Sequence, residues 1–335
     1  MRALVKDSPG PGPVSVVELD DRPPGPGEAR IALLRAGICH TDIAMVEGLL
    51  GEAQGYRPRY PVVLGHEFLG RVVALGPGAS GVEVGDRVVG SGHLTCRSCR
   101  WCTAGRSQLC VDRRTIGIDA DGVYAERFSL PASSLVPVPA DVSDELAALA
   151  EPFAVSARAV DVAAIRPGER VAVIGPGSVG QLTVAALAGH DVTVVGRPAD
   201  EVQLERCRTF GATRTVSDPG EVGELSDAFD VVLETAGSGA AVGTGITMLA
   251  PGGRIVCVGV PPDETVFRSA DLVLRERSII GTRSYDLSTW RTIPDRLRAA
   301  PQLAEIVSHV LPLEKFAEGR DLVTSRTASK VVMVP

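Results

Sequence analysis

The 335-residue sequence contains no apolar run long enough to cross a membrane as a helix, which needs about 18 residues. Its first residues, MRALVKDSPG, lack the apolar stretch of about 7–15 residues that marks a secretory signal peptide. Lysine and arginine form no run and the net charge is −7, so neither a nucleic acid nor an anionic membrane is favoured as a partner. These absences predict a cytoplasmic protein that binds neither.

Tandem repeats and low-complexity tails are also absent from the sequence. A chain of 335 residues is long for a single hydrophobic core, and its 44% hydrophobic content supports well-packed interiors. The 37 glycines and 24 prolines favour turns. We therefore expect two domains with many tight connections.

The densest motif is a group of four cysteines in the stretch CRSCRWCTAGRSQLC, at Cys96, Cys99, Cys102 and Cys110. Without a secretion signal the chain is expected in a reducing compartment, where cysteines stay thiols instead of forming disulfides. Four thiolate ligands on one short loop suit a closed, tetrahedral structural zinc site. The alternative is a set of buried or redox-active thiols. We predict the zinc site, in a lobe over residues 93–112.

The rest of the chain shows two patterns of apolar residues and turns. Up to about residue 150, short β-branched runs alternate with Gly/Pro turns, which predicts an all-β domain with strands near 14–19, 29–35, 69–75 and 86–90. Helical stretches at 146–162 and 179–188 then alternate with apolar runs at 171–175, 192–196, 231–234 and 254–260. This alternation predicts a doubly wound parallel sheet. Signals weaken after about residue 284 and end in a strand-like run at 330–334.

A glycine motif follows the first apolar run of the α/β region. The segment VAVIGPGSVG places a buried strand before Gly175, Gly177 and Gly180, and a predicted helix follows. In this context the first glycine permits a tight turn, the second lets the backbone approach a pyrophosphate, and the third allows close helix–strand packing. The free N–H groups at the helix start, near Ser178 and Val179, suit phosphates. The alternative is a glycine-rich connection without a ligand.

The end of the next apolar run indicates which dinucleotide binds. An acidic residue there would accept hydrogen bonds from the ribose of NAD, but this chain has Gly196 and Arg197. A guanidinium suits the 2′-phosphate of NADP, so NADP is predicted over NAD. Two alternatives stay open: Arg197 is merely solvated, or Asp200 or Glu201 reaches the ribose.

Three further segments carry metal-ligand chemistry: Cys39-His40-Thr41-Asp42, Gly65-His66-Glu67 and Glu151-Pro152. Each is ordinary alone. Together with the cysteine lobe and the glycine motif, in this order along nearly the whole chain, they resemble the zinc-dependent medium-chain alcohol dehydrogenase family. The resemblance implies a GroES-like catalytic domain over residues 1–153, a Rossmann NAD(P)-binding domain over 154–283, and a return to the catalytic domain over 284–335.

The resemblance also implies site residues and two zinc ions per chain. The catalytic zinc would be held by Cys39, His66 and Glu151, with Glu67 as a transient ligand and one position open to substrate. Asp42 would orient the histidine ligand, and Thr41 would hydrogen-bond the substrate oxygen. The residues implied to contact the cofactor outside the glycine motif are His40, Thr235, Ala236, Gly237, Val258, Gly259 and Val260.

Some positions depart from the family pattern. Glutamate followed by proline at 151–152 resembles the polyol and threonine dehydrogenase branch, whereas the tetrapeptide CHTD is more similar to microbial alcohol dehydrogenases. Residues 45–58, MVEGLLGEAQGYRP, lack the aromatic-rich loop of threonine dehydrogenases, which disfavours threonine as substrate. Ala44 replaces a histidine that relays the proton in many relatives, which leaves ribose hydroxyls, His40 or ordered water for that step.

These features predict hydride transfer between NAD(P) and a primary or secondary alcohol, a polyol, or the corresponding carbonyl compound. One alternative is a zinc-independent quinone or enoyl reductase of the same superfamily, which would lack the ligands Cys39, His66 and Glu151. Another is a non-enzymatic zinc-ribbon protein. The family resemblance further implies a homodimer or homotetramer, with residues 277–284 as a pairing edge strand. The alternative is an interior strand in a monomer.

Overall fold

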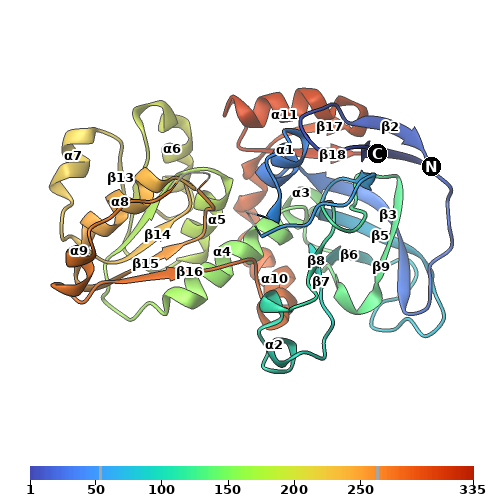
Figure 1. The fold of residues 1–335 in the computed structure, drawn as a ribbon, viewed down its shortest axis with the longest axis horizontal. Helices are drawn as coiled ribbons and strands as arrows, with labels where there is room; N and C mark the ends of the chain where they lie inside the picture. Colours follow the sequence, from blue (N-terminus) through green and yellow to red (C-terminus); the bar gives the residue numbers. More distant parts are fainter. Residues whose placement is uncertain (53–54, 262–263) are drawn as a thin grey trace. The chain divides into compact units, whose positions relative to one another are not determined.

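The computed structural model describes residues 1–52, 55–261 and 264–335, which form two compact units. Unit 1 comprises Met1–Glu151 and Asp286–Pro335, and unit 2 comprises Pro152–Tyr285. Both chain termini therefore belong to unit 1 (Figure 1). Among the described residues, no helix combines the length and apolar character that a membrane span requires.

Unit 1 is built on a mostly antiparallel sheet. Its longest strand, β3 (Glu28–Gly37), pairs with β5 (Glu67–Leu75), β9 (Arg127–Pro131) and β18 (Lys330–Val334). The same sheet contains β6 (Arg87–Gly90), β10 (Leu135–Pro137) and β17 (Val307–Pro312). The last two strands of the chain thus complete the sheet begun by the first 151 residues. The other strands of this unit are β1 (Arg2–Lys6), β2 (Ser15–Glu18), β4 (Val62–Val63), β7 (His93–Leu94) and β8 (Arg114–Thr115).

The helices of unit 1 are short or lie in the C-terminal segment: α1 (His40–Val46), α2 (Arg100–Thr103), α3 (Asp144–Ala147), α10 (Leu287–Arg298) and α11 (Phe316–Thr324). The core beneath them is aliphatic and aromatic; Ile31, Phe68 and Phe316 are each at most 2% exposed. Alternating side chains of β3 supply much of this core, as period-2 strands with one buried face require.

Unit 2 is a six-stranded, wholly parallel sheet in the order β13-β12-β11-β14-β15-β16. The strands are β11 (Val171–Ile174), β12 (Val192–Val195), β13 (Arg214–Val216), β14 (Phe229–Glu234), β15 (Leu249–Cys257) and β16 (Ser278–Gly281). The helices are α4 (Ala150–Ala163, which begins at the end of unit 1), α5 (Ser178–Ala186), α6 (Glu201–Thr209), α7 (Pro219–Glu224), α8 (Gly239–Met248) and α9 (Ser269–Val273) (Figure 1). Strands β11 and β12 are buried along their whole length, as expected for central strands of a parallel sheet. The predicted doubly wound sheet is confirmed.

Two helical expectations are corrected. The stretch predicted as one helix over 146–162 is two helices, α3 and α4. Pro152 explains the break, because in a continuous helix its ring would clash with the carbonyl four residues earlier. The C-terminal segment also contains a 12-residue helix, α10, which the sequence did not predict. Pro294 lies inside it, and an internal proline normally argues against a helix.

The predicted edge strand occupies the edge of the parallel sheet. Among the described residues, β16 pairs only with β15, so the interior-strand alternative is wrong. The strand is short and mostly exposed, and Ile279 remains 36% accessible. An unpaired apolar edge of this kind can accept a further strand.

Candidate active site

The first candidate ligand, Cys39, lies two residues after the end of β3. Cys39 precedes α1 and caps its start, and the Asp42 carboxylate reaches back to accept the Cys39 backbone N–H at 2.9 Å. This hydrogen bond satisfies a backbone N–H group that has no partner within the helix. Asp42 is 1% exposed, so the turn fixes a charged oxygen inside unit 1.

Strand register brings the second segment to the same place. Gly37, at the end of β3, pairs with Glu67, at the start of β5, so Cys39 and His66 lie at neighbouring strand ends. Gly65, directly before His66, has a φ of +90°, and a Cβ there would come within 2.4 Å of the Tyr124 ring. Only glycine combines this left-handed backbone with such close contact.

Cys39, His66 and Glu67 form one group of potential metal ligands. Their ligand atoms all lie within 4.8 Å of one another, and His66 and Glu67 are 6% and 1% exposed. His66 Nδ1 faces Asp42 Oδ1 at 3.4 Å, which leaves its Nε2 for a metal ion. A thiolate, an imidazole and a carboxylate are a donor set that zinc accepts in proteins. The residues present therefore fit a zinc ion.

The Asp42 carboxylate is held ionised by what surrounds it. Burial alone would raise its pKa, but the facing imidazole of His66 and the Cys39 N–H bring the pKa below its ordinary value. The Tyr124 hydroxyl lies 2.8 Å from both Asp42 Oδ2 and the Gly37 carbonyl oxygen, and can donate to one of them at a time. Tyr124 is fully buried, and sequence reasoning did not single it out.

The predicted third ligand, Glu151, lies close to this group but outside the 4.8 Å set. It stands in the first turn of α4, where the break at Pro152 places it. A Cβ on Gly92 would come 3.4 Å from Glu151 Oε1 and 3.3 Å from the His66 carbonyl oxygen. Gly92 thus leaves room for the Glu151 carboxylate beside the His66 backbone.

Glu67 has an unexpected partner in Lys330. The Lys330 Nζ lies 2.5 Å from Glu67 Oε2 and also donates to the Ile38 carbonyl oxygen at 2.9 Å. Lys330 is only 3% exposed, and buried lysines are rare unless paired. The only sequence signal was a single lysine opening the otherwise apolar run 330–334.

The two remaining residues of the first segment, His40 and Thr41, begin α1. The Thr41 hydroxyl is 3.6 Å from the Cys39 sulfur and Thr41 is half-buried, so its side chain points toward the ligand group. His40 is the first residue of α1 and is exposed.

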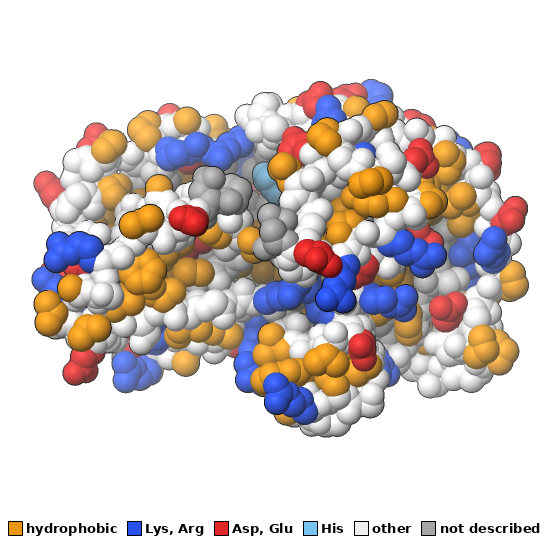
Figure 2. Space-filling model, viewed as in Figure 1, with side chains coloured by type: hydrophobic (Ala, Val, Ile, Leu, Met, Phe, Trp, Pro, Cys, Tyr) orange, Lys and Arg blue, Asp and Glu red, His pale blue; other side chains and the backbone are white. Residues whose placement is uncertain are grey.

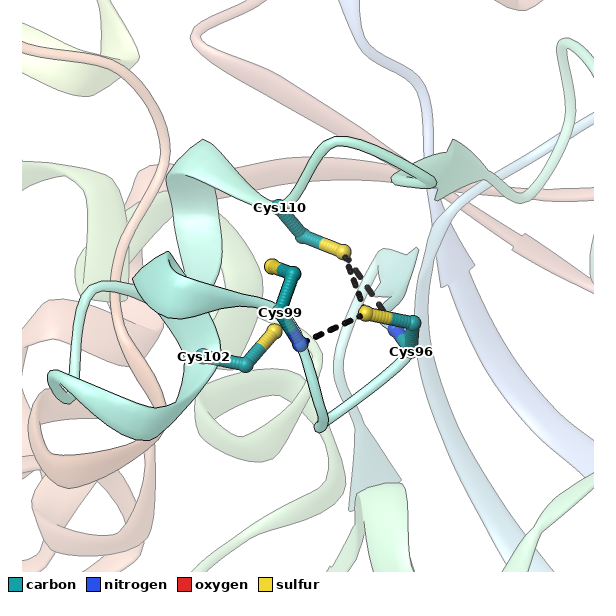
Figure 3. Close-up of side chains that lie close together, drawn as sticks. All are labelled: Cys96, Cys99, Cys102 and Cys110. Carbon is teal, nitrogen blue, oxygen red and sulfur yellow. Dashed lines mark hydrogen bonds between the residues drawn. The ribbon is translucent and has the colours of Figure 1, made fainter.

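The four lobe cysteines converge as their spacing predicted. Their sulfur atoms all lie within 4.8 Å of one another, and Figure 3 shows the four side chains pointing into one space. Cys96 comes from the loop after β7, Cys99 from the start of α2, Cys102 from α2 itself and Cys110 from the loop after Leu109. The Cys96 and Cys110 sulfurs are 3.5 Å apart, too far for a disulfide. The short β7–β8 ladder closes the lobe at its base.

Backbone N–H groups lower the pKa of the Cys96 and Cys99 thiols, whereas burial raises the pKa of Cys102 and Cys110. Cys110 Sγ accepts from the Cys96 N–H at 3.3 Å, and Cys96 Sγ accepts from the Cys99 N–H at 3.4 Å. N–H groups of Ser98 and Cys99 lower the pKa of the Cys96 thiol to about 6. The geometry fits a four-thiolate metal site.

The glycine motif in unit 2 has the predicted turn. Gly175 has a φ of +100°, and a Cβ there would come 2.8 Å from Ala236. A Cβ on Gly180 would lie 1.9 Å from the Gly175 carbonyl oxygen, so α5 can pack here only without a side chain. A Cβ on Gly177 would meet nothing within 4 Å among the described residues. The space beside the Gly177 backbone is therefore open to a ligand, directly before α5 begins with Ser178 and Val179.

Arg197 does not project freely. It forms a two-pronged ion pair with Asp200, with Nε–Oδ2 and Nη2–Oδ1 distances of 2.9 and 2.6 Å, while its guanidinium stays 55% exposed. Asp200 also accepts the Arg197 backbone N–H at 3.0 Å. Gly196 lies directly before this pair, at the end of β12.

The other implied cofactor residues follow β14 and β15 at the carboxyl edge of the parallel sheet. The Thr235 hydroxyl lies 2.9 and 2.8 Å from the carbonyl oxygens of Ile174 and Gly175 and can donate to one of them at a time. Gly237 has a φ of +68°, and Val260 is 72% exposed. The same loops contain Ala236, Val258 and Gly259. Ligands of open parallel sheets bind at this edge.

Each of the two units matches a known protein family. Residues 25–140 match the alcohol dehydrogenase GroES-like domain, and residues 178–299 match the zinc-binding dehydrogenase family. The expected GroES-like and Rossmann architecture is thereby confirmed.

Curated relatives align along the whole chain. An L-threonine 3-dehydrogenase of Vibrio parahaemolyticus is 32% identical over 99% of this chain and 98% of its own length. A sorbitol dehydrogenase of Halalkalibacterium halodurans is 33% identical over 100% and 99%. Among solved structures, a zinc-binding dehydrogenase of Sinorhizobium meliloti, described as bound to NADP, superposes with a TM-score of 0.89 at 29% identity, covering 100% of this chain and 99% of its own.

Proposed function

This chain belongs to the zinc-dependent medium-chain alcohol dehydrogenase family, and we propose that its two metal sites each hold zinc and that it favours NADP over NAD. Its reaction is hydride transfer between NAD(P) and an alcohol or the corresponding carbonyl compound. The observation that carries the proposal is the group formed by half-buried Cys39 with buried His66 and Glu67, with Asp42 behind the imidazole. A zinc-independent reductase of the same superfamily would not need this group.

Cys39 and His66 would hold the catalytic zinc, with Glu151 and Glu67 as the carboxylates beside it. A zinc ion bound there supplies Lewis-acid polarisation of the substrate oxygen and lowers the pKa of the substrate hydroxyl. The nicotinamide supplies the hydride acceptor or donor. Asp42 keeps His66 in one tautomer and one ring orientation through the 3.4 Å contact at Nδ1.

The proton of the substrate hydroxyl passes to the chain's own residues. Thr41 is the first acceptor, because its hydroxyl can both accept and donate and lies beside the Cys39 sulfur. Ala44 cannot continue the relay. The imidazole of His40 can accept the proton and return it to solvent, because desolvation and the charge of Lys330 lower its pKa and keep the ring neutral at pH 7.

A polyol is the substrate class that the chain supports best. The relatives named above act, by their names, on threonine and on sorbitol, which both carry a secondary hydroxyl, and their identities of 32% and 33% do not separate the two. The absence of the aromatic-rich loop in residues 45–58 favours the polyol; Ala53 and Gln54 within this stretch lie outside the described residues.

A substrate screen tests the proposal. Purified zinc-loaded protein is incubated with simple alcohols, polyols, threonine and ketones, with NAD and with NADP, and nicotinamide absorbance is followed. We expect turnover of at least one secondary alcohol or polyol and its loss after chelation. Reduction of a quinone or enone that survives chelation would instead establish the zinc-independent reductase.

Arg197→Ala tests the preference for NADP. If Arg197 contacts the 2′-phosphate, the dissociation constant for NADP should rise roughly tenfold to a hundredfold, because a bidentate charged contact is worth about 1.5–3 kcal/mol. The constant for NAD should barely change. Asp200→Asn should have the opposite effect, since it frees the guanidinium and removes a negative charge near the phosphate.

Arg208→Ala is the matched control for this prediction. Arg208 is similarly exposed and pairs with Glu205 three residues earlier, but lies on α6 instead of at the end of β12. It should affect neither cofactor. Equal losses of NAD and NADP affinity in Arg197→Ala would show that Arg197 does not read the phosphate.

We also propose a homodimer or homotetramer in which β16 pairs with its copy. The stretch 260–279 contains six of the chain's exposed large apolar side chains, including Val266, Val273 and Leu274 at 86%, 74% and 82% exposure. Figure 2 shows apolar side chains gathered over the region where α9 and β16 lie in Figure 1. An apolar surface beside an open strand edge suits a second copy.

Light scattering at micromolar concentration checks this assembly. We expect a particle of two or four times 35.0 kDa. Ile279→Lys should shift it toward the monomer, because a charge on an edge strand opposes pairing. Val202→Lys, an exposed apolar position on α6, should leave the mass unchanged. A 35.0 kDa particle for the unaltered chain would rule out the oligomer.

A further inference from the structure

Glu234 is a buried carboxylate that neither metal site nor the mechanism above uses. It is the last residue of β14 and is 0% exposed. In the parallel ladder it stands opposite Ile174 on one side and Cys257 on the other, at the carboxyl edge of the sheet. A buried carboxylate is costly unless several donors surround it.

The side chain of Glu234 reaches one of the loops at this edge and its backbone reaches the other, while Oε2 has no hydrogen-bond partner among the described residues. Glu234 Oε1 accepts the Gly237 N–H at 2.7 Å. Burial raises the pKa of Glu234, while N–H groups of Gly237, Ala236, Ser238 and Gly259 oppose that rise. The Glu234 carbonyl oxygen also accepts the Val258 N–H at 2.9 Å. Glu234 thus binds the loop after β14 through its carboxylate and the loop after β15 through its backbone carbonyl.

The two loops touch each other, backbone against backbone, beside this carboxylate. A Cβ on Gly259 would lie 2.3 Å from the Gly237 Cα and 3.2 Å from Glu234 Oε2. Ala236 in turn packs against Gly175, whose Cβ would come within 2.8 Å of it. The glycine turn and both loops therefore form one packed edge, with Glu234 at its centre.

We propose that Glu234 is a positioning residue that fixes the loops 235–238 and 258–259 in one arrangement and thereby sets the affinity of the dinucleotide site. The inference rests on the proposed function, because it assumes that these loops receive NAD(P). Its physical basis is that both loops face one shared acceptor, with Oε1 bonding the Gly237 N–H and Oε2 lying beside the backbone of Gly259. Without one, the loops separate or leave donors unpaired, at a cost of the same order as a lost charged hydrogen bond.

Glu234→Gln is the most direct variant. It keeps the shape of the side chain but removes the charge and turns one oxygen into an N–H donor that faces other donors. In fluorescence titrations without substrate, the dissociation constants for NADH and NADPH should both rise, roughly tenfold to a hundredfold. Gly259→Ala, which inserts a methyl between the loops and leaves the carboxylate intact, should also weaken both cofactors.

Asp230→Asn is the matched control. Asp230 lies near the amino end of the same strand, is half-buried, and accepts the Arg170 backbone N–H at 2.8 Å. Its replacement also removes a carboxylate that binds a backbone amide, so it should lower thermal stability. Because it is remote from the carboxyl edge, both cofactor dissociation constants should stay at the wild-type values.

Hydrogen–deuterium exchange of the cofactor-free protein separates failure of this inference from failure of the proposed function. We expect faster exchange at residues 236–238 and 258–259 in Glu234→Gln and unchanged exchange there in Asp230→Asn. Wild-type exchange rates in Glu234→Gln would overturn the inference even if the dinucleotide binds. Wild-type cofactor affinities in both Glu234→Gln and Gly259→Ala would also overturn it. Failure of the wild-type protein to bind either dinucleotide would overturn the proposed function instead, and the exchange rates would still decide whether Glu234 fixes the loops.

Discussion

Replacing Cys39 with alanine is expected to lower kcat/KM for alcohol oxidation by about a thousandfold or more, because a Lewis-acid metal contributes several kcal/mol to the transition state. Elemental analysis should find one zinc per chain where the unaltered protein has two. The chain should remain folded, since Cys39 lies on a turn held by the Asp42 carboxylate and the Cys39 N–H, which the substitution keeps. Circular dichroism and zinc content measured together check this result.

A graded series makes this prediction specific. Asp42→Asn keeps all three ligands but weakens the support of His66, so activity or zinc affinity should fall by about tenfold to a hundredfold. Cys257→Ala replaces a half-buried cysteine in β15 and should leave both zinc ions in place. Two zinc ions and full activity in Cys39→Ala would refute the assignment of the catalytic site.

Loss of one lobe cysteine should act on stability instead of chemistry. Cys102→Ser is expected to release the second zinc and lower the melting temperature by roughly 10 °C or more, because structural zinc binding contributes folding free energy and each kcal/mol lost lowers the melting temperature of a unit of this size by about 2–4 °C. The Cys102 sulfur lies within 4.8 Å of the other three sulfurs, so no neighbouring group replaces it without rearrangement. Calorimetry with zinc analysis provides the measurement.

Cys207→Ala is the control for the lobe. Cys207 is fully buried on α6 and lies outside both ligand groups, so its loss leaves a small cavity but no metal effect. Both zinc ions should remain. If Cys102→Ser retained two zinc ions and the melting temperature of the unaltered protein, the cysteines would be plain thiols, as the alternative interpretation of the motif held.

Local features were determined by the sequence alone. Four cysteines within fifteen residues converge because the loop that carries them is too short to keep them apart. The glycine motif also gave its own turn, since Gly175 adopts a φ that other residues avoid and Gly180 packs where a Cβ would clash. The parallel sheet followed from alternating periods of strand and helix, although Pro152 and Pro294 acted differently from expectation because one divided a helix and the other lies inside one.

Tertiary structure alone decided the partners of the buried charges. The Lys330 ammonium donates to the carbonyl oxygen of Ile38, 292 residues away in the sequence, and forms an ion pair with Glu67. The Tyr124 hydroxyl contacts the carboxylate of Asp42, 82 residues away. The sequence predicted Arg197 as a contact for the 2′-phosphate, with a solvated side chain as one alternative, and only the fold shows its ion pair with Asp200. Hydrophobic period and turn residues act over a few positions and are visible in a sequence. Which buried charge meets which depends on strand order and register, because only the closed sheet brings distant strand ends within hydrogen-bond distance.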